Sequence, residues 1–90
     1  NGVIKMKTRF NKRERKLIED IESAEQCVSE NCELEMDFWN DGWYAYEYNG
    51  DVSKSMDDFS IEPLITESEI QEENVDVYAV FDYCHVACCG

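Results

Sequence analysis

The sequence predicts an α+β domain in which one long N-terminal helix packs on a small antiparallel sheet of three or four strands. The expected order is helix, strand, strand, short helix, strand. Two observations support it: apolar residues recur at helical spacing after residue 12, and residues 32–38 and 75–83 alternate with the period of a half-buried strand. Ninety residues provide one modest core. Residues 1–90 are therefore predicted to be a single acidic domain, with residues 1–10 a candidate for a flexible basic arm.

The N-terminal helix is predicted over residues 12–29. Asn11 and Glu14 have the spacing of a capping box, in which each side chain accepts a hydrogen bond from the other residue's backbone N–H. An apolar stripe follows at helical spacing. Its members are Leu17, Ile18, Ile21, Ala24 and Val28. We expect this stripe to cover the tyrosine side of the hairpin that comes next.

Residues 32–49 are predicted to form that β-hairpin. Asn40, Asp41 and Gly42 fit a three-residue loop in which glycine adopts the left-handed conformation. This loop would set Trp39 opposite Trp43. Leu34, Met36 and Phe38 would then share a face with Tyr44, Tyr46 and Tyr48, and the acidic residues would occupy the other face.

Two shorter elements are expected in the second half of the chain. Thr66 and Glu69 repeat the capping-box spacing, which predicts a short helix over residues 67–73. Residues 75–83 alternate and are rich in valine and aromatic side chains, which predicts a third strand. It could lie beside either strand of the hairpin.

Charge is strongly negative and unevenly placed. The chain has 21 acidic and 8 basic residues, a formal net charge of −13, and 7 of those 8 basic residues lie within the first 16 positions. Either the basic segment neutralises the acidic sheet internally, or the two ends of the molecule prefer different partners. No apolar run is long enough to span a bilayer and no secretion signal is present, so a cytoplasmic location without membrane contact is expected.

Five cysteines and one histidine form the most specific chemical feature. They are Cys27, Cys32, Cys84, Cys88, Cys89 and His85. Cys27, Cys32, Cys84 and Cys88 only approximate the ligand spacing of a zinc site, and the odd count argues against a complete set of disulfides, which favours free thiols. A Cys/His nucleophile is disfavoured, because acidic surroundings raise a thiol pKa. We therefore predict neither an enzyme nor a cofactor.

The acidic face of the predicted sheet is the candidate partner-binding site. Carboxylates two residues apart on a strand lie about 6.7 Å from one another, a spacing that resembles a row of phosphates. Aromatic anchors beside them would suit an interface, although Trp39 and Trp43 could merely stack across the hairpin. The predicted site comprises Glu33, Glu35, Asp37, Trp39, Trp43, Glu47, Asp76, Tyr78 and Asp82.

These features favour a protein-binding inhibitor whose acidic surface imitates nucleic acid. The expected partner is a basic nucleic-acid-binding protein such as a nuclease, whereas direct binding of nucleic acid is disfavoured by the repulsive net charge. Phage anti-CRISPR or anti-restriction proteins and immunity proteins for nuclease toxins resemble the chain in size and charge, but no residue motif matches them. The alternative is a zinc- or thiol-stabilised structural or regulatory module.

Overall fold

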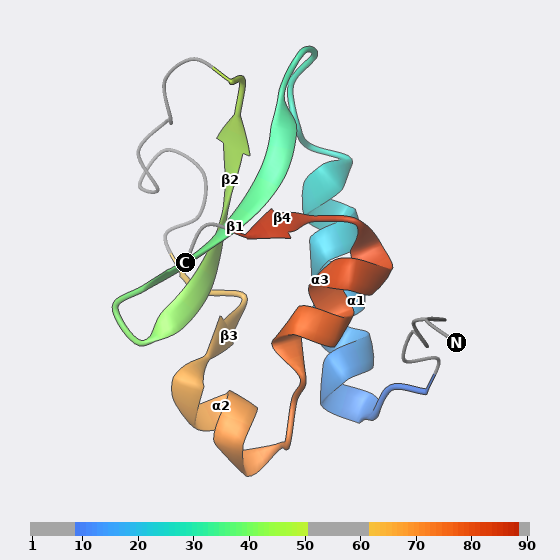
Figure 1. The fold of residues 1–90 in the computed structure, drawn as a ribbon, viewed down its shortest axis with the longest axis vertical. Coiled ribbons are helices and arrows are strands. Elements are labelled where there is room, and N and C mark those ends of the chain that lie inside the picture. Colours follow the sequence, from blue (N-terminus) through green and yellow to red (C-terminus); the bar gives the residue numbers. More distant parts are fainter. Residues whose placement is uncertain (1–8, 51–61, 89–90) are drawn as a thin grey trace, which may run out of the picture.

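A computed structural model describes residues 9–50 and 62–88. Within these two ranges, three helices and four strands follow one another (Figure 1). They are α1 (Lys12–Glu25), β1 (Glu33–Trp39), β2 (Gly42–Tyr48), β3 (Ile65–Thr66), α2 (Glu67–Glu72), α3 (Val77–Cys84) and β4 (Ala87–Cys88). The predicted α+β class is confirmed. Most of the predicted N-terminal arm, residues 1–8, lies outside the described residues.

The sheet has the strand order β3-β2-β1-β4 and is mixed rather than purely antiparallel. β1 pairs antiparallel with β2, and β2 with β3, whereas β4 runs parallel to β1. Helices α1 and α3 lie side by side against one face of the sheet (Figure 1). None of the helices in the described ranges has the length and apolar character required to cross a bilayer.

Helix α1 begins as predicted and ends earlier. The Asn11 side chain accepts the backbone N–H of Glu14 at 2.8 Å, and Glu14 accepts the backbone N–H of Asn11 at 2.8 Å, which completes the capping box. The helix ends at Glu25, with Gln26 as its C-cap, so the predicted extension to residue 29 is wrong.

The predicted hairpin register is wrong by one residue. Trp39 pairs with Gly42 and Phe38 pairs with Trp43, so the loop contains only Asn40 and Asp41. These two residues have φ values of 46° and 67°, the left-handed pair that a two-residue type I′ turn requires. Gly42 belongs to the strand instead, where a Cβ atom would lie only 2.6 Å from Cβ of Pro63. Close approach of another segment, rather than a left-handed backbone, explains this glycine.

The corrected register redistributes the side chains of the hairpin. The face covered by α1 and α3 carries Leu34, Met36, Phe38, Trp43, Ala45 and Glu47. The opposite face, here called the outer face, carries Glu33, Glu35, Asp37 and Trp39 beside Tyr44, Tyr46 and Tyr48. The prediction that α1 covers the tyrosine side is therefore wrong, because the tyrosines accompany the acidic residues.

Residues 77–84 form helix α3, so the predicted third strand over residues 75–83 is wrong. Asp76 is the N-cap and accepts the backbone N–H of Ala79 at 3.1 Å. Val77, Val80 and Phe81 are buried at helical spacing, whereas Tyr83, which the strand prediction placed on the apolar side, is exposed. Burial of this helical stripe against α1 and the sheet outweighs the strand preference of valine and aromatic residues.

A buried carboxylate joins α1 to α3. Glu14 is fully buried, and while one of its oxygens caps α1, the other accepts the backbone N–H of Asp76 at 2.8 Å. The Asn11 amide donates to the carbonyl oxygens of Glu73 and Asn74, each at 3.1 Å. The two residues of one capping box therefore fix both the start of α1 and the entry to α3.

The short helix α2 confirms the second predicted capping box. Thr66 accepts the backbone N–H of Glu69, and Glu69 accepts the backbone N–H of Thr66 at 3.0 Å. That backbone hydrogen bond lowers the pKa of the Glu69 carboxyl, and Arg13, whose Nε lies 3.4 Å from it, contributes in the same direction. Arg13 also donates to the carbonyl oxygen of Leu64 at 2.9 Å, which attaches β3 and α2 to α1.

Candidate functional site

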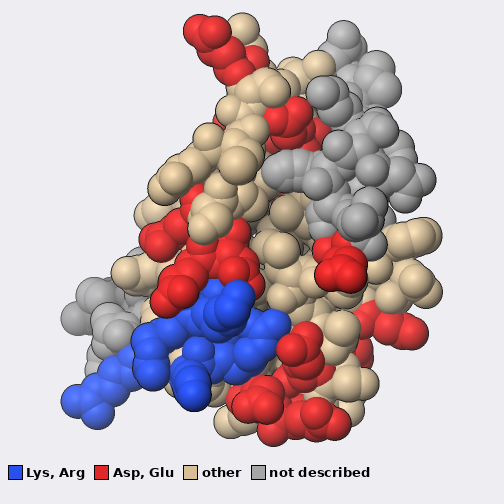
Figure 2. Space-filling model, turned by 180° about the vertical axis from the view of Figure 1, so that it is seen from behind, with Lys and Arg blue, Asp and Glu red and all other residues tan. Residues whose placement is uncertain are grey.

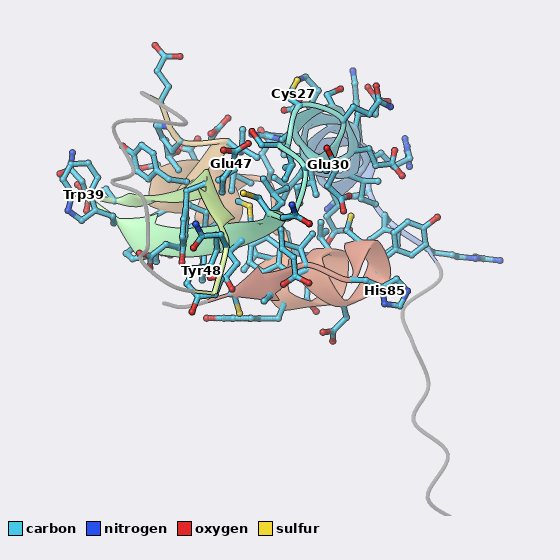
Figure 3. The ribbon with its side chains drawn as sticks, turned by 90° about the horizontal axis from the view of Figure 1, so that it is seen from above. Cys27, Glu30, Trp39, Glu47, Tyr48 and His85 are labelled. Carbon is cyan, nitrogen blue, oxygen red and sulfur yellow. The ribbon has the colours of Figure 1, made fainter. Side chains whose placement is uncertain are left out.

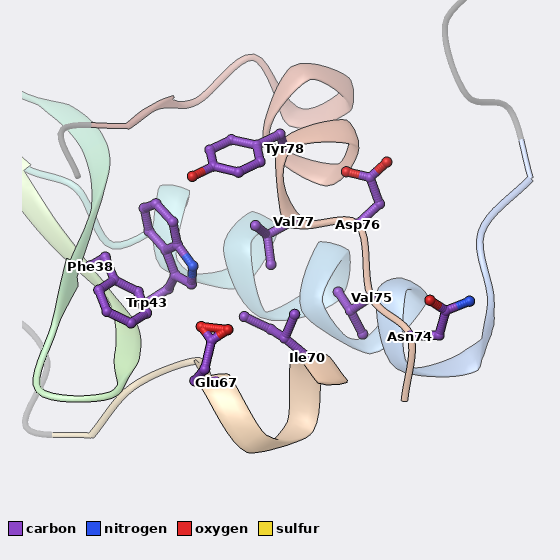
Figure 4. A pocket seen from close by; sticks show the side chains of 9 residues that line it. All are labelled: Phe38, Trp43, Glu67, Ile70, Asn74, Val75, Asp76, Val77 and Tyr78. Atoms are coloured by element: carbon purple, nitrogen blue, oxygen red, sulfur yellow. The ribbon is translucent and has the colours of Figure 1, made fainter. Parts of the chain in front are cut away.

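A cleft of about 750 Å³ opens between the hairpin tip, α2 and the start of α3 (Figure 4). Its aromatic lining comes from Phe38, Trp43 and Tyr78, and its aliphatic lining from Ile70, Val75 and Val77. Glu67, Asn74 and Asp76 supply the polar groups. The volume lies within the range of about 300–1,000 Å³ that is typical of small-molecule and cofactor sites. We call this site the aromatic cleft.

Contacts between the rings hold the aromatic side chains of the cleft. Trp43 is only 4% exposed, and its ring centroid lies 5.5 Å from that of Phe38 and 5.8 Å from that of Tyr78. Beneath it, Phe81 packs edge to face at 5.0 Å. Phe38 and Tyr78 stay 39% and 58% exposed respectively. The buried indole thus supports two aromatic rings that remain open to solvent.

Backbone hydrogen bonds place the acidic residues at the cleft. The N–H of Glu67 donates to the carbonyl oxygen of Asp41 at 2.8 Å, which attaches the start of α2 to the hairpin turn. Asp76 is held at the start of α3 by its capping bond and by Glu14. Among the described residues, no lysine or arginine lines the cleft. Its aromatic surface is therefore combined with negative charge.

The structure brings three of the predicted site residues, Trp43, Asp76 and Tyr78, to this cleft. Tyr78 and Asp76 reach it from α3 and not from a strand, and Trp43 is a core residue that supports the site from below. Asp82, also on α3, is exposed but does not line the cleft. Sequence reasoning missed Phe38 and Glu67. The position of Glu67 in the first turn of α2 could have been predicted, because it directly follows the predicted cap Thr66.

The outer face holds Glu33, Glu35, Asp37 and Trp39, but it is not the open carboxylate array that the sequence predicts. Glu35 is only 8% exposed and accepts a hydrogen bond from the Tyr46 hydroxyl at 2.7 Å. Trp39 is 51% exposed, points away from the helices and packs its ring against Tyr44 at 5.4 Å (Figure 3). Tyrosines rather than acids thus lie opposite the acidic strand.

Glu47 lies on the opposite side of the sheet from that predicted array. It is buried, and its carboxylate accepts the backbone N–H of Ser29 at 2.7 Å. The loop after α1 is thereby attached to β2. Glu47 has a structural role in the fold, so it is removed from the candidate binding residues.

Comparison of the chain with protein-family models, curated proteins and solved structures gave no match.

The cysteines do not converge as a four-ligand site. Cys27, Cys32, Cys84 and Cys88 are free thiols, and Cys89 lies outside the described residues. In the part of the chain that the structure describes, no three His, Cys, Asp or Glu side chains are grouped so that they could hold a metal ion. The direction of β4 accounts for this. Because β4 runs parallel to β1, His85 lies with Cys32 at one shallow pocket, and Cys88 continues to the position opposite Met36.

The Cys84 thiol is poorly suited to nucleophilic chemistry. Desolvation by burial raises its pKa to about 11, and the nearby carboxylates Glu22 and Glu25 add to this rise. The thiolate is the reactive form of cysteine, so little of it exists at neutral pH. The described residues that line the cleft have aromatic, aliphatic, carboxylate or amide side chains.

The basic side chains gather at the start of α1 (Figure 2). The described members of this cluster are Arg9, Lys12, Arg13, Arg15 and Lys16. Within residues 9–50 and 62–88, ion pairs join Arg13 to Glu69 and Lys16 to Asp20. Arg13 thus pairs with α2 and Lys16 with its own helix, whereas the internal-neutralisation interpretation expected pairing with the sheet.

A row of exposed carboxylates begins where this cluster ends. Glu19 and Glu22 border a pocket that also contains Arg9, Arg15 and Tyr83, and Glu25 and Glu33 border a second pocket with His85. Consecutive members on α1 are three residues apart, which corresponds to a rise of about 4.5 Å along the helix. We call these four residues, Glu19, Glu22, Glu25 and Glu33, the acidic row. Only Glu33 was among the predicted site residues.

Proposed function

We propose that the protein is an acidic, non-enzymatic inhibitor that occupies the basic groove of a nucleic-acid-binding protein such as a nuclease. The acidic row is the observation that supports this proposal. Its four residues are exposed, and the three on α1 follow one another at about 4.5 Å of rise along the helix axis, compared with about 3.4 Å between successive charges on one DNA strand. A basic groove that binds a phosphate backbone would therefore meet a similar charge density.

Segregation of charge gives this surface a direction. Along the chain the basic residues of α1 precede the acidic row, and Arg9 and Arg15 share a pocket with Glu19 and Glu22. A partner with a uniformly basic groove would be repelled on that side and attracted beyond it. Electrostatic complementarity of this kind favours fast association and one orientation of docking. The proposal keeps the cytoplasmic location expected from the sequence, as for phage anti-CRISPR, anti-restriction or toxin-immunity proteins.

Partner capture followed by competition tests the proposal. We expect the immobilised protein to retain a basic protein from its host extract, and a DNA or RNA oligonucleotide to release that protein in a concentration-dependent manner. Recovery of a partner that binds no nucleic acid would contradict the proposal. So would a partner that binds an oligonucleotide and this protein simultaneously.

Two matched variants show whether the acidic row is the surface involved. Glu22→Gln/Glu25→Gln removes two charges from the row, and Glu72→Gln/Glu73→Gln removes two exposed charges elsewhere. Both variants have the same net charge. We expect the first to weaken partner binding at least fivefold and the second to weaken it less than twofold. Equal weakening would mean that only the total charge matters.

A further inference from the structure

We propose that the aromatic cleft binds an arginine side chain presented by an extended segment of a partner protein. The inference goes beyond the proposed function, because it concerns a different surface from the acidic row and requires nothing of the partner except an accessible arginine. Ring geometry, charge and the size of the cleft support it.

The aromatic surface of the cleft is arranged for a flat cation. Tyr78 and Phe38 are 58% and 39% exposed, and each packs against the buried Trp43 with its ring nearly perpendicular to the indole, at 87° and 72° respectively. This packing holds both rings in place at the mouth of a concave site. The face of an aromatic ring attracts a guanidinium group electrostatically, and rings that are already fixed lose little freedom on binding.

The charge of the cleft selects a cation over a neutral apolar group. Glu67 points towards the rings of Phe38 and Trp43 (Figure 4). Its carboxylate accepts no hydrogen bond from the described residues and is therefore available to a ligand. Asp76 borders the far end of the cleft and adds negative charge, although one of its oxygens already accepts the N–H of Ala79. The described part of the lining includes no lysine or arginine, so its charged groups are all carboxylates.

Arginine fits this combination better than lysine. Its planar guanidinium can stack on an aromatic face while its N–H groups form a paired hydrogen bond with a carboxylate such as Glu67. Guanidinium is also more weakly hydrated than ammonium, so it loses less on leaving water.

A protein segment, rather than a free cation, uses the rest of the site. The cleft measures about 750 Å³ and continues past the rings along Ile70, Val75 and Val77. The indole nitrogen of Trp43 faces this space (Figure 4). An indole N–H is a donor only, so it calls for an acceptor such as the backbone carbonyl beside the arginine.

Titration with small probes monitored by NMR tests the inference without the partner. The probes are the N-acetyl amides of arginine, of citrulline and of lysine, each followed through the backbone amide and indole signals of the labelled protein. Citrulline has the shape of arginine without its charge. We expect arginine to shift the amide signals of Glu67 and Tyr78 and the indole signal of Trp43, with smaller shifts for lysine and none for citrulline. The indole of Trp39, on the outer face, should not move.

Paired variants on the same helices separate the cleft from general acidity. Tyr78→Ala and Glu67→Gln should each weaken the binding of the arginine probe about three- to fivefold, the loss expected for one exposed cation–π contact or one exposed ion pair. Tyr83→Ala on α3 and Glu72→Gln on α2 should leave it unchanged. The inference is overturned if citrulline binds as well as arginine, if the shifts map to the acidic row, or if Tyr78→Ala binds normally. These outcomes leave the proposed function standing, because it is tested with a different surface and a different ligand.

Discussion

At the scale of single residues, neighbouring tryptophan positions have opposite roles. Trp43 is 4% exposed and contacts Phe38, Tyr78 and Phe81, whereas Trp39 is 51% exposed and contacts only the Tyr44 ring among the described aromatic residues. The one-residue difference in register decides which tryptophan faces the core. The prediction that Trp39 and Trp43 lie opposite one another on the acidic face is therefore wrong.

Substitution of the two tryptophans should separate these roles. Trp43→Ala is expected to lower the free energy of unfolding by about 3–5 kcal/mol, because a large core side chain leaves a cavity. Trp39→Ala should cost about 1 kcal/mol, the contribution of one aromatic pair. Urea denaturation followed by circular dichroism measures both, with Trp43→Phe as a milder variant if the alanine form does not fold. Equal losses at the two positions would contradict the observed register.

The cysteine thiols should react with an alkylating reagent at different rates, and the buried Cys84 should react most slowly. At pH 8 only about one thousandth of Cys84 is thiolate, since burial raises its pKa to about 11. In single-cysteine variants, iodoacetamide should therefore modify Cys84 far more slowly than the exposed Cys27 or Cys88, and its rate should keep rising towards pH 11. The double variant Glu22→Gln/Glu25→Gln should increase the rate at which iodoacetamide modifies Cys84, and should leave the rates of the other cysteines unchanged. A Cys84 rate that levels off near pH 8 would contradict this account.

At the scale of elements, the hairpin turn has a favoured residue, Asn40, at its first position and a less favoured one, Asp41, at its second. Asn40 and Asp41 both have positive φ, a conformation in which glycine avoids the steric cost that other residues meet. Asp41→Gly would create the Asn-Gly pair that type I′ turns prefer and would keep the backbone carbonyl that binds Glu67.

Substitution of Asp41 in the turn and of Gly42 at the start of β2 should have opposite effects. Asp41→Gly is expected to raise stability by up to about 1 kcal/mol, because it removes the left-handed strain. Gly42→Ala should lower stability, since the new methyl group would meet Pro63 at 2.6 Å. Thermal denaturation of the two variants measures these changes. A harmful Asp41→Gly would contradict the two-residue turn, and a neutral Gly42→Ala would contradict the close approach of Pro63 to Gly42.

Patterns among residues close together in the sequence predicted the starts of two helices, but they did not predict the hairpin register or helix α3. The capping boxes at Asn11 and Thr66 predicted two helix starts, because a cap depends only on residues three positions apart. The glycine at position 42 instead reflects contact with Pro63, which lies more than 20 residues further along the chain. Residues 75–83 carry both a strand pattern and a helical one, and packing against α1 decides between them.

The candidate sites could also be predicted only as far as they depend on residues close together in the sequence. Alternation along β1 correctly placed Glu33, Glu35, Asp37 and Trp39 on one face. Which residues lie opposite that strand follows from the register, and the aromatic cleft combines residues from the hairpin, α2 and α3 that are up to 40 positions apart. No local pattern brings Phe38 and Tyr78 together.

At the scale of the whole molecule, the net charge of −13 opposes folding through self-repulsion. Two ion pairs are found in the described ranges, at 3.4 Å and 2.8 Å, and both involve exposed or partly exposed side chains. Exposed pairs of this kind contribute at most about 1 kcal/mol each. Repulsion among the remaining carboxylates should therefore exceed the attraction within the molecule.

The response of stability to salt distinguishes this charge balance from internal neutralisation. Charges interact over about 30 Å at 0.01 M salt and over only about 3 Å at 1 M salt. Added KCl should therefore weaken the repulsion between carboxylates and raise the melting temperature. Glu22→Gln/Glu25→Gln, which removes two neighbouring charges of the acidic row, should show a smaller rise, and its melting temperature at low salt should exceed that of the unmodified protein.

If the basic segment neutralised the acidic surface, screening would remove attraction instead, and the melting temperature would fall as KCl is added. Calorimetry at constant pH between 0.01 M and 0.5 M KCl measures the sign of this slope. A negative slope would contradict an unneutralised acidic surface, and with it the electrostatic basis of partner binding.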